Sequence, residues 1–374
     1  MSNDTAREQR TGSARLPLAL ILLTIAGLAG VVLWLTLAPP PAAPRSAVQI
    51  SIAPPAAKPP APKPPAPVEP QPDAPVPDAP KPPPASAPPR PDPTPVAAKL
   101  PPIETVPALS VAPEPGLTEP SSHGPLPIVG RDGREAWKVY AGAVDTEDKK
   151  FRIAIVLHGL GMDATATRSA IQNLPGAITL AFTPYAGGLD GWVAQARAAG
   201  HEVLMMVPME AVDFPISDPG PRALLTSLSA AENIDRLEWV LARATGYVGV
   251  TEYRGSRFVT SPRHMETLFQ ALRKRGLLFL AGNRRTAPLL AKIAKPQRLP
   301  FAASTLYIDN RATRGLIESQ LAELERLARN SGRAIGMGFP YPLTIEYLAN
   351  WAAKLKDRGF TLTPVSALTT RSGS

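Results

Sequence analysis

The distribution of proline most constrains what this chain can fold into. Of its 47 prolines, 33 fall between Pro39 and Pro127. Proline fixes φ and has no N–H donor, so such a run favours extended polyproline II over helices and sheets. The run also offers few large apolar side chains to offset the entropy of folding. We therefore predict a disordered Pro/Ala-rich spacer over residues 39–128, followed by one globular domain over residues 129–374.

The spacer has two interpretations. At about 3.1 Å per residue, roughly 90 residues could reach on the order of 200 Å. The alternative is a set of PxxP docking sites, which would give the chain a protein partner through its Pro-rich segment. Because the low-complexity sequence contains no distinguishable motif, the spacer interpretation is favoured.

An apolar segment precedes the spacer. Leu16–Ala38 contains 23 residues and no charged side chain, which is long enough to cross a bilayer. Arg7, Arg10 and Arg15 precede it. The positive-inside rule therefore places residues 1–15 in the cytoplasm and everything after Ala38 outside it. A cleavable signal peptide is disfavoured, because its apolar core spans only about 7–15 residues. We predict a single-pass anchor in the cytoplasmic (inner) membrane and a periplasmic C-terminal domain.

Residues 129–374 alternate short aliphatic runs with amphipathic stretches, which predicts a parallel α/β fold. The expected strands are Arg152–Leu157, Ala177–Phe182, Glu202–Val207, Tyr247–Val250, Leu277–Leu280, Thr305–Ile308, Ala334–Met337 and Thr361–Pro364. The expected helices are Asn233–Ala244, Pro262–Arg275, Leu316–Asn330 and Leu343–Arg358. Ser229 and Glu232 form a capping box before the first of these helices. This alternation allows an open sheet or a (β/α) barrel.

Composition excludes several classes of function. The chain has no Cys and only four His, which rules out disulfide scaffolds, thiol nucleophiles and Cys-based metal sites. No Gly-rich phosphate loop follows any expected strand, so nucleotide binding has no support. Residues 129–374 hold 31 Lys and Arg against 22 Asp and Glu, which accounts for the whole net charge of +9. This excess favours an anionic envelope polymer as partner. Nucleic acid is not expected, since the domain is exported and carries no nucleic-acid-binding motif.

Seven motifs occur in order along the domain. They read IAIVLHGLG, LAFTPYA, ARAAGHEVLMMVPME, DPGP, VGVTEYRGSRF, LYIDN and AIGMGFPYPLT. This series resembles the divergent polysaccharide deacetylase family, a distant relative of NodB-type carbohydrate esterases that occurs as exported bacterial envelope proteins. The resemblance covers about residues 150–370. It implies a distorted (β/α) barrel of seven or eight strands, whose site binds a sugar chain and, in active relatives, a divalent metal.

The residues depart from the family pattern at the metal-binding and catalytic positions. His158 and Gly159 stand where the family has two acidic residues, and Thr251–Arg254 replaces its Asn-Asn-His-Met. Asn283–Thr286 replaces Asp-Ser-Arg-Thr, and Phe339 and Tyr341 replace both His of its Gly-His-Pro-His-Pro. Metal-dependent deacetylation needs several His or carboxylate ligands and a general base. We therefore expect no metal and no cofactor, and the sequence leaves open whether the chain is an enzyme.

Three titratable residues could form a rearranged catalytic site. His158, Glu210 and Glu252 fall at expected strand ends and could converge on one divalent ion such as zinc. The alternative is that His158 makes a hydrogen bond within the rim while Glu210 caps a loop or pairs with an Arg. We favour the alternative.

Five residues are candidates for ligand binding. Tyr253, Phe339 and Tyr341 present aromatic faces that could stack on sugar rings, or could simply fill the space that a metal has left. Asp309 is either a turn former or a ligand contact. Arg257 either binds sugar or pairs with a carboxylate, and the ion pair is favoured.

The remaining His and one Trp have other expected roles. His201 precedes its strand, together with Glu202, so both should lie at the structural end opposite the site. His264 is expected to be solvated on its helix, and His123 to lie in the spacer. Trp192 could add a further aromatic face.

The leading hypothesis is a membrane-anchored envelope protein whose deacetylase-like domain binds an envelope glycan without the family's metal-dependent catalysis. The first alternative is an active carbohydrate esterase or deacetylase with a rearranged site around His158, Glu210 and Glu252. The second alternative is a structural or protein-interaction module of an envelope assembly.

Overall fold

The computed structural model describes residues 100–101, 106–142, 144 and 150–370. The predicted membrane helix at residues 16–38 lies outside the described residues, as do residues 39–99 of the predicted spacer. None of the helices that the structure describes has the length and apolar composition that a bilayer crossing requires.

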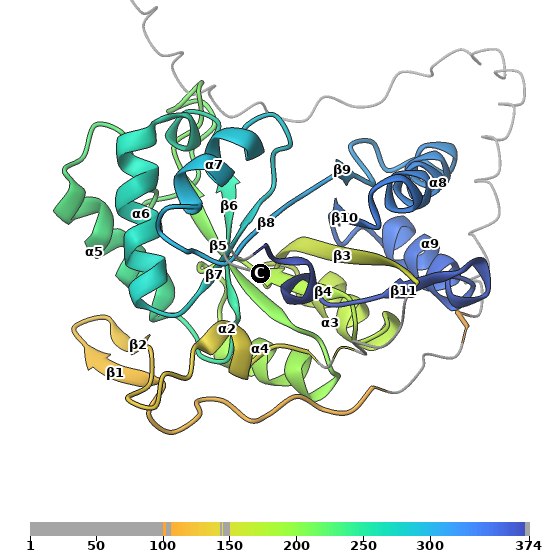
Figure 1. The fold of residues 1–374 in the computed structure, drawn as a ribbon, viewed down its shortest axis with the longest axis horizontal. Helices are drawn as coiled ribbons and strands as arrows, with labels where there is room; N and C mark the ends of the chain where they lie inside the picture. Colours follow the sequence, from red (N-terminus) through yellow and green to blue (C-terminus); the bar gives the residue numbers. More distant parts are fainter. Residues whose placement is uncertain (1–99, 102–105, 143, 145–149, 371–374) are drawn as a thin grey trace, which may run out of the picture. The chain divides into compact units, whose positions relative to one another are not determined.

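A curled parallel sheet forms the centre of the domain (Figure 1), and it confirms the predicted α/β class. Its strands are β3 (Phe151–Leu160), β4 (Thr179–Phe182), β5 (Val203–Met209), β6 (Gly249–Arg254), β7 (Leu278–Ala281), β8 (Phe301–Ala303), β9 (Leu306–Tyr307), β10 (Arg333–Gly338) and β11 (Phe360–Leu362). The order along the sheet is β8-β7-β6-β5-β4-β3-β10-β9, and β11 pairs with β3. These strands are rich in buried Val, Leu, Ile and Phe, as parallel strands covered on both faces require.

The two edge strands of this sheet are consecutive in the chain. Only Ser304 and Thr305 separate β8 from β9. The Ser304 N–H donates to the carbonyl of Ala281 on β7 (2.8 Å), and the Thr305 N–H donates to the carbonyl of Ile335 on β10 (2.7 Å). One short segment therefore contacts both edges of the sheet. The sheet curls into a half-barrel of eight strands, whereas we predicted a distorted (β/α) barrel.

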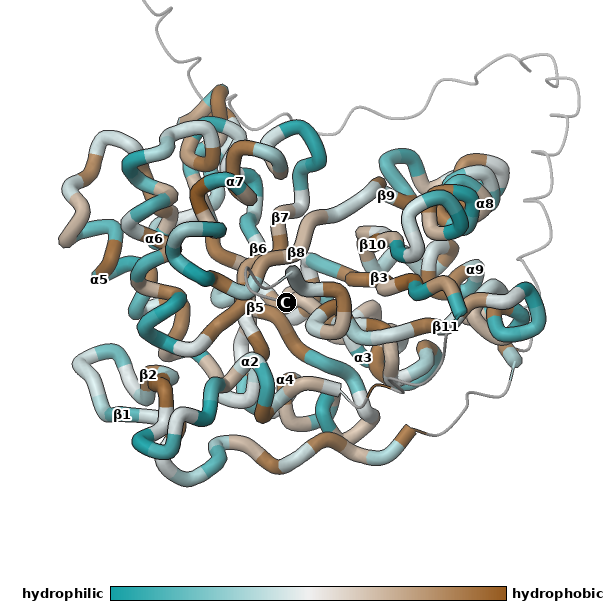
Figure 2. Tube along the Cα trace, viewed as in Figure 1, coloured by the Kyte–Doolittle hydropathy of each residue, from teal (hydrophilic) through white to brown (hydrophobic). Residues whose placement is uncertain are grey.

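Helices follow the strands and cover the sheet (Figure 1). They are α2 (Ala136–Val139), α3 (Ala164–Asn173), α4 (Leu189–Ala198), α5 (Ala230–Leu241), α6 (Pro262–Lys274), α7 (Ala287–Ala294), α8 (Arg314–Ser331) and α9 (Pro342–Ala353), with short 3-10 turns at Phe258–Thr260, Lys356–Arg358 and Val365–Leu368. Figure 2 shows hydrophobic residues along the central strands and hydrophilic ones on the outer helices. The predicted capping box begins α5: the Glu232 N–H donates to Ser229 Oγ, and the Ser229 N–H donates to the Glu232 carboxylate.

The folded domain begins before residue 129, which corrects the predicted end of the spacer. β1 (Thr118–Ser121) and β2 (Gly124–Pro127) form an antiparallel hairpin. The buried side chains of Leu117 and Leu126 join the hydrophobic core. Prolines are tolerated here because both strands are short edge strands.

Residues 106–113, which we call the strap, pack against the N-terminal ends of the strands. The Leu109 N–H donates to the carbonyl of Arg197 on α4 (3.0 Å). The buried Arg197 guanidinium donates in turn to the Ser110 carbonyl (2.7 Å), to the Gly246 carbonyl (2.7 Å) and to the Tyr140 carbonyl (3.1 Å). Arg197 thus links three chain segments, those of Ser110, Tyr140 and Gly246, at this end of the half-barrel.

The retained Gly-His-Glu element lies at the same end, as predicted. His201 is fully buried and its Nδ1 lies 2.8 Å from the carbonyl oxygen of Ile178. Glu202 is also fully buried and accepts hydrogen bonds from the Ser366 N–H (3.1 Å) and hydroxyl and from the Gly142 N–H (3.2 Å). Both residues therefore join separate segments of the fold at the end opposite the strands' carboxyl ends.

Candidate functional site

A cleft of about 930 Å³ opens at the carboxyl ends of β6, β7, β9 and β10. The segment Ser304–Thr305, which joins the two edges of the sheet, contributes to its lining. The lining residues are His158, Glu252, Tyr253, Arg254, Gly282, Asn283, Arg284, Arg285, Ser304, Thr305, Leu306, Tyr307, Asn310, Gln320, Glu323, Leu327 and Phe339. Clefts of this size at the carboxyl ends of parallel strands are the usual ligand sites of α/β folds.

Glu252 is the carboxyl group at the inner part of this cleft. β6 continues four residues beyond its expected end at Val250, so Glu252 lies on the strand. Its Oε1 accepts hydrogen bonds from the N–H groups of Gly282 (2.7 Å) and Asn283 (3.2 Å), while its Oε2 is buried without a partner. Burial raises the pKa of Glu252 to about 7, although the backbone donors favour the ionised form.

His158 lies across the cleft from Glu252, on β3. The bulge that follows it is at Gly159, whose φ of 89° is in the region that favours glycine. The imidazole packs against the Phe339 ring, with centroids 4.2 Å apart, and its Nε2 is buried without a partner. Burial lowers the pKa of His158 to about 4, so the ring is neutral at physiological pH.

Tyr307 lies near both Glu252 and His158. We did not identify it as a site residue from the sequence. Its ring meets the His158 imidazole edge to face, with centroids 5.6 Å apart. A Cβ placed on Gly282 would lie 3.3 Å from the Tyr307 hydroxyl and 3.4 Å from Glu252 Oε1, so both oxygens border the same glycine. Burial, with the neighbouring Glu252 and Asp309 carboxyls, raises the pKa of Tyr307 above its ordinary value. Consecutive residues from Ser304 to Tyr307 line the cleft, so the alternation of a strand offered no signal for Tyr307.

Asp309, which we predicted as a ligand-binding residue, is not among the residues that line the cleft. It is buried, and its Oδ2 accepts hydrogen bonds from the Phe339 N–H and the Thr344 hydroxyl, both at 2.8 Å. Asp309 therefore fixes the position of Phe339. Tyr341 is 45% exposed and packs on Phe339 at a centroid distance of 5.6 Å, but it too lies outside the cleft lining.

Glu210 and Arg257 do not reach the cleft, so the three candidate catalytic residues do not converge. Glu210 Oε2 accepts hydrogen bonds from the Thr226 N–H (2.5 Å) and hydroxyl (2.6 Å). Its Oε1 lies 3.5 Å from Arg257 Nη1, and Arg257 also donates to the Val212 carbonyl. Glu210 thus holds a loop and pairs with an Arg, which is the arrangement of the favoured alternative. β5 ends at Met209, which bridges to Leu224, so the chain turns toward the Thr226 loop there.

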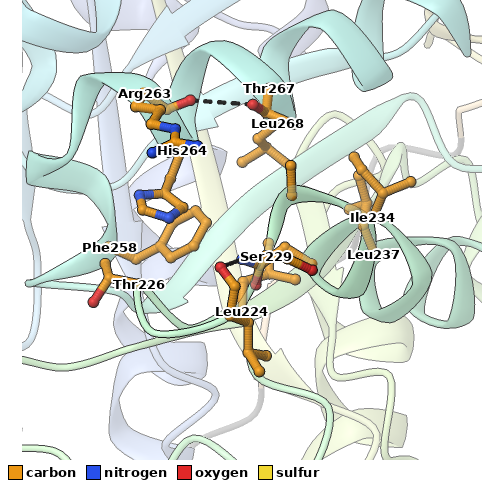
Figure 3. Close-up of a pocket in the computed structure, with 13 residues that line it drawn as sticks. Leu224, Thr226, Ser229, Ile234, Leu237, Phe258, Arg263, His264, Thr267 and Leu268 are labelled. Carbon is orange, nitrogen blue, oxygen red and sulfur yellow. Dashed lines mark hydrogen bonds between the residues drawn. The ribbon is translucent and has the colours of Figure 1, made fainter.

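A separate pocket of about 130 Å³, which Thr226 lines, lies between α5 and α6 (Figure 3). His264 lines it, half-buried, with Nδ1 2.7 Å from Ser261 Oγ and its ring against Phe258. The expectation of a solvated His264 is therefore wrong. His123, expected in the spacer, lies in the β1–β2 hairpin beside Asp235 at 2.8 Å. Trp192 lies on α4 near Arg168 and outside the cleft lining.

Comparison with known proteins identifies the family of this chain. The model of the family described as divergent polysaccharide deacetylase matches residues 155–369. This chain belongs to that family. An uncharacterised protein of Haemophilus influenzae is 28% identical over 198 residues, covering 53% of this chain and 69% of that protein. The uncharacterised protein YibQ of Escherichia coli is 25% identical over 219 residues, covering 58% of this chain and 67% of YibQ.

A solved structure shows the same fold. The crystal structure of an uncharacterised protein from Agrobacterium tumefaciens C58 superposes with a TM-score of 0.64 at 36% sequence identity. The match covers 66% of this chain and 99% of that chain. The two chains therefore share the same fold over this region.

The residues in the cleft do not fit the divalent metal that active relatives of this family would hold. Within the described ranges, no group of three or more His, Asp or Glu side chains is placed to bind one ion. The His158 imidazole is covered by the Phe339 ring, and one oxygen of Glu252 is already bound by two N–H groups. What the cleft does provide is aromatic faces, one carboxyl group whose pKa burial raises to about 7, and three exposed arginines.

Proposed function

We propose that this chain binds a carbohydrate chain of the cell envelope in the cleft, without the metal-dependent deacetylation of its family. In this proposal residues 16–38 anchor the chain in the inner membrane, and the Pro-rich segment carries the domain into the periplasm. The observation that supports glycan binding most directly is the pair of rings on the cleft wall, Tyr307 and Phe339, whose centroids lie 6.3 Å apart. Aromatic faces stack on the C–H faces of sugar rings as they do on other apolar groups, and the Tyr hydroxyl adds a polar contact.

Removing these rings should weaken glycan binding. We expect Tyr307→Ala and Phe339→Ala each to reduce the affinity of the full-length protein for an envelope oligosaccharide by roughly fivefold to a hundredfold, since a buried aromatic contact contributes about 1–3 kcal/mol. Isothermal titration calorimetry in a mild detergent measures this effect. Tyr307→Phe, which keeps the ring, should retain most of the affinity.

The matched control is Trp192→Ala, which removes a half-buried aromatic side chain outside the cleft lining. Its affinity should equal that of the wild type. Unchanged binding by a folded Tyr307→Ala/Phe339→Ala double variant would exclude the cleft as the glycan site.

A second function, carbohydrate ester or amide hydrolysis with a rearranged site, is favoured by Glu252. A general acid or base works best when its pKa lies near the operating pH, and the pKa of Glu252 is about 7. Its buried Oε2 has no protein partner and the carboxyl borders the cleft. His158 and Tyr307 would be its neighbours, whereas Glu210 takes no part.

If this second function holds, the wild type should release acetate from an acetylated glycan, and Glu252→Gln should lower the rate by about 10²–10⁴-fold. Enzymatic detection of free acetate measures the turnover. Glu210→Gln, which changes a carboxyl outside the cleft, should keep the wild-type rate. Equal rates for wild type and Glu252→Gln, or no acetate from any acetylated glycan tested, would refute the hydrolytic hypothesis.

A further inference from the structure

Three arginines lie together on one side of the cleft. Arg254 ends β6, and Arg284 and Arg285 follow β7; all three line the cleft and are exposed. Within the described part of the chain, none of them has a carboxylate within 4.0 Å. These three guanidiniums are therefore not held in close ion pairs with carboxylates of the described residues, although the charge of Arg284 acts on Glu323.

The loop that carries two of these arginines is fixed to the strand that carries the third. The Glu252 carboxyl accepts from the N–H groups of Gly282 and Asn283, which begin this loop. The Asn283 side chain then accepts from the Arg285 N–H at 2.9 Å, which closes a tight turn. The backbone at Arg285 consequently keeps a defined position relative to the strand that carries Arg254.

Arg254 itself adopts a strained backbone conformation. Its φ is 63°, in the left-handed region that non-glycine residues rarely adopt. Its guanidinium lies over the Tyr253 ring, 5.6 Å from the centroid. Such strain persists where the surrounding structure imposes it, and it concentrates at ligand-binding sites.

The acidic residues of the cleft do not neutralise this rim. Glu323 on α8 is bound by both arms of Arg326, at 2.7 and 2.6 Å, so Arg326 is its main partner and the charge of Arg284 adds a weaker interaction. Glu252 is bound to backbone N–H groups and has its remaining oxygen buried. The arginine rim therefore sets the sign of the potential at the cleft entrance.

We propose that the glycan bound in this cleft is acidic, and that Arg254, Arg284 and Arg285 bind its carboxylate or phosphate groups while its sugar rings stack on Tyr307 and Phe339. The inference builds on the proposed glycan-binding function and narrows its substrate class. The planar guanidinium group donates two parallel hydrogen bonds that match the spacing of carboxylate and phosphate oxygens. A neutral glycan would offer the three guanidiniums only uncharged hydroxyl and ring oxygens as acceptors, whose hydrogen bonds are weaker than those of an ionised group.

The test uses the full-length protein in mild detergent and two pairs of oligosaccharides. One pair consists of a uronic-acid oligosaccharide and the same chain with its carboxyls reduced to alcohols. The other consists of a phosphorylated oligosaccharide and its dephosphorylated form. Calorimetry should show at least tenfold tighter binding of the acidic member of one pair, and the pair that shows it identifies the acid group.

The triple variant Arg254→Gln/Arg284→Gln/Arg285→Gln should bind that acidic member on the order of tenfold to a hundredfold more weakly. Its affinity for the neutral member should not change. The matched control Arg168→Gln/Lys292→Gln/Lys354→Gln removes the same charge from exposed positions outside the cleft lining and should bind as the wild type does.

The outcomes separate the two proposals. Equal wild-type affinity for acidic and neutral members overturns the acidic-ligand inference and leaves glycan binding in place. Equal weakening by the rim and control variants also overturns it, because net charge alone would then explain the preference. Binding of neither member overturns the proposed function, and this inference with it.

Discussion

Replacing Glu252 by Gln should stabilise the protein at pH 8 more than at pH 5. The pKa of this carboxyl is about 7 in the folded protein and about 4.5 when unfolded. Between these values the folded state holds a proton that the unfolded state has released, so folding stability falls as pH rises through this window. The free energy of unfolding of Glu252→Gln minus that of the wild type should therefore increase by about 2–3 kcal/mol from pH 5 to pH 8, since each pKa unit corresponds to about 1.4 kcal/mol.

The measurement uses the difference in free energy of unfolding between Glu252→Gln and the wild type, because the titration of His158 changes stability with pH in the opposite direction. Its pKa falls from 6.5 to about 4 on folding, so it contributes stability that is lost as pH falls through 6.5 toward 4. In the wild type the pH dependences of stability from Glu252 and His158 partly cancel. Subtracting the wild-type free energy of unfolding from that of Glu252→Gln removes the contribution of His158 and leaves that of Glu252. Urea unfolding followed by circular dichroism at pH 5, 6, 7 and 8 measures the difference.

Glu323→Gln is the control, because it makes the same substitution in the same cleft. Hydrogen bonds from Arg326 lower the pKa of Glu323, so its carboxylate is ionised in both states across this range. The free energy of unfolding of Glu323→Gln minus that of the wild type should therefore stay constant from pH 5 to pH 8. If the difference in free energy of unfolding were also constant with pH for Glu252→Gln, it would contradict a pKa of Glu252 that burial has raised.

Replacing Glu202 by Ala should cost about 3–5 kcal/mol at the opposite end of the half-barrel. The substitution leaves the Ser366 N–H and hydroxyl and the Gly142 N–H without their acceptor, and it opens a cavity at a fully buried position. Burial raises the pKa of Glu202, while the hydrogen bonds from Ser366 and Gly142 favour its ionised form. Thermal unfolding should show a decrease of the order of 10 °C in Tm.

Glu202→Gln is the matched variant, since the amide keeps one oxygen acceptor and the same volume. It should lose less than half as much stability as Glu202→Ala. Hydrogen exchange of the turn Val365–Leu368 provides a second measurement, and its protection should fall only in the Ala variant. A loss below about 1 kcal/mol in Glu202→Ala would show that the network contributes little.

Much of the fold could be predicted from local patterns in the sequence. The expected strands coincide with the observed ones to within a few residues, because buried parallel strands form continuous aliphatic runs. The position of Glu202 at the structural end followed from its place before a strand. The folded start of the domain was missed because residues 106–127 contain many prolines, yet these occupy an edge hairpin and the strap, where no sheet donor is needed.

The site could be predicted only in part, because its geometry depends on pairings between distant segments. The rule that strand ends share one edge of a sheet brought His158 and Glu252 into one cleft but also added Glu210, whose chain turns toward Thr226 instead. Tyr307 became part of the cleft because the chain crosses from β8 to β9 at Ser304–Thr305. No local pattern in the sequence indicates that crossing.

The strap determines how the domain would respond to a pull on its N-terminal side. Residues 106–113 lie along the end of the half-barrel where the strands begin (Figure 1), whereas the residues that line the cleft lie where the strands finish. Tension entering at the strap is carried by the Leu109–Arg197 and Arg197–Ser110 hydrogen bonds into α4. Neither bond is made by a residue of β6, β9 or the loop after β7, although Arg197 also holds the Gly246 carbonyl ahead of β6. We expect a pull at the strap to break these bonds before it changes the geometry of the cleft.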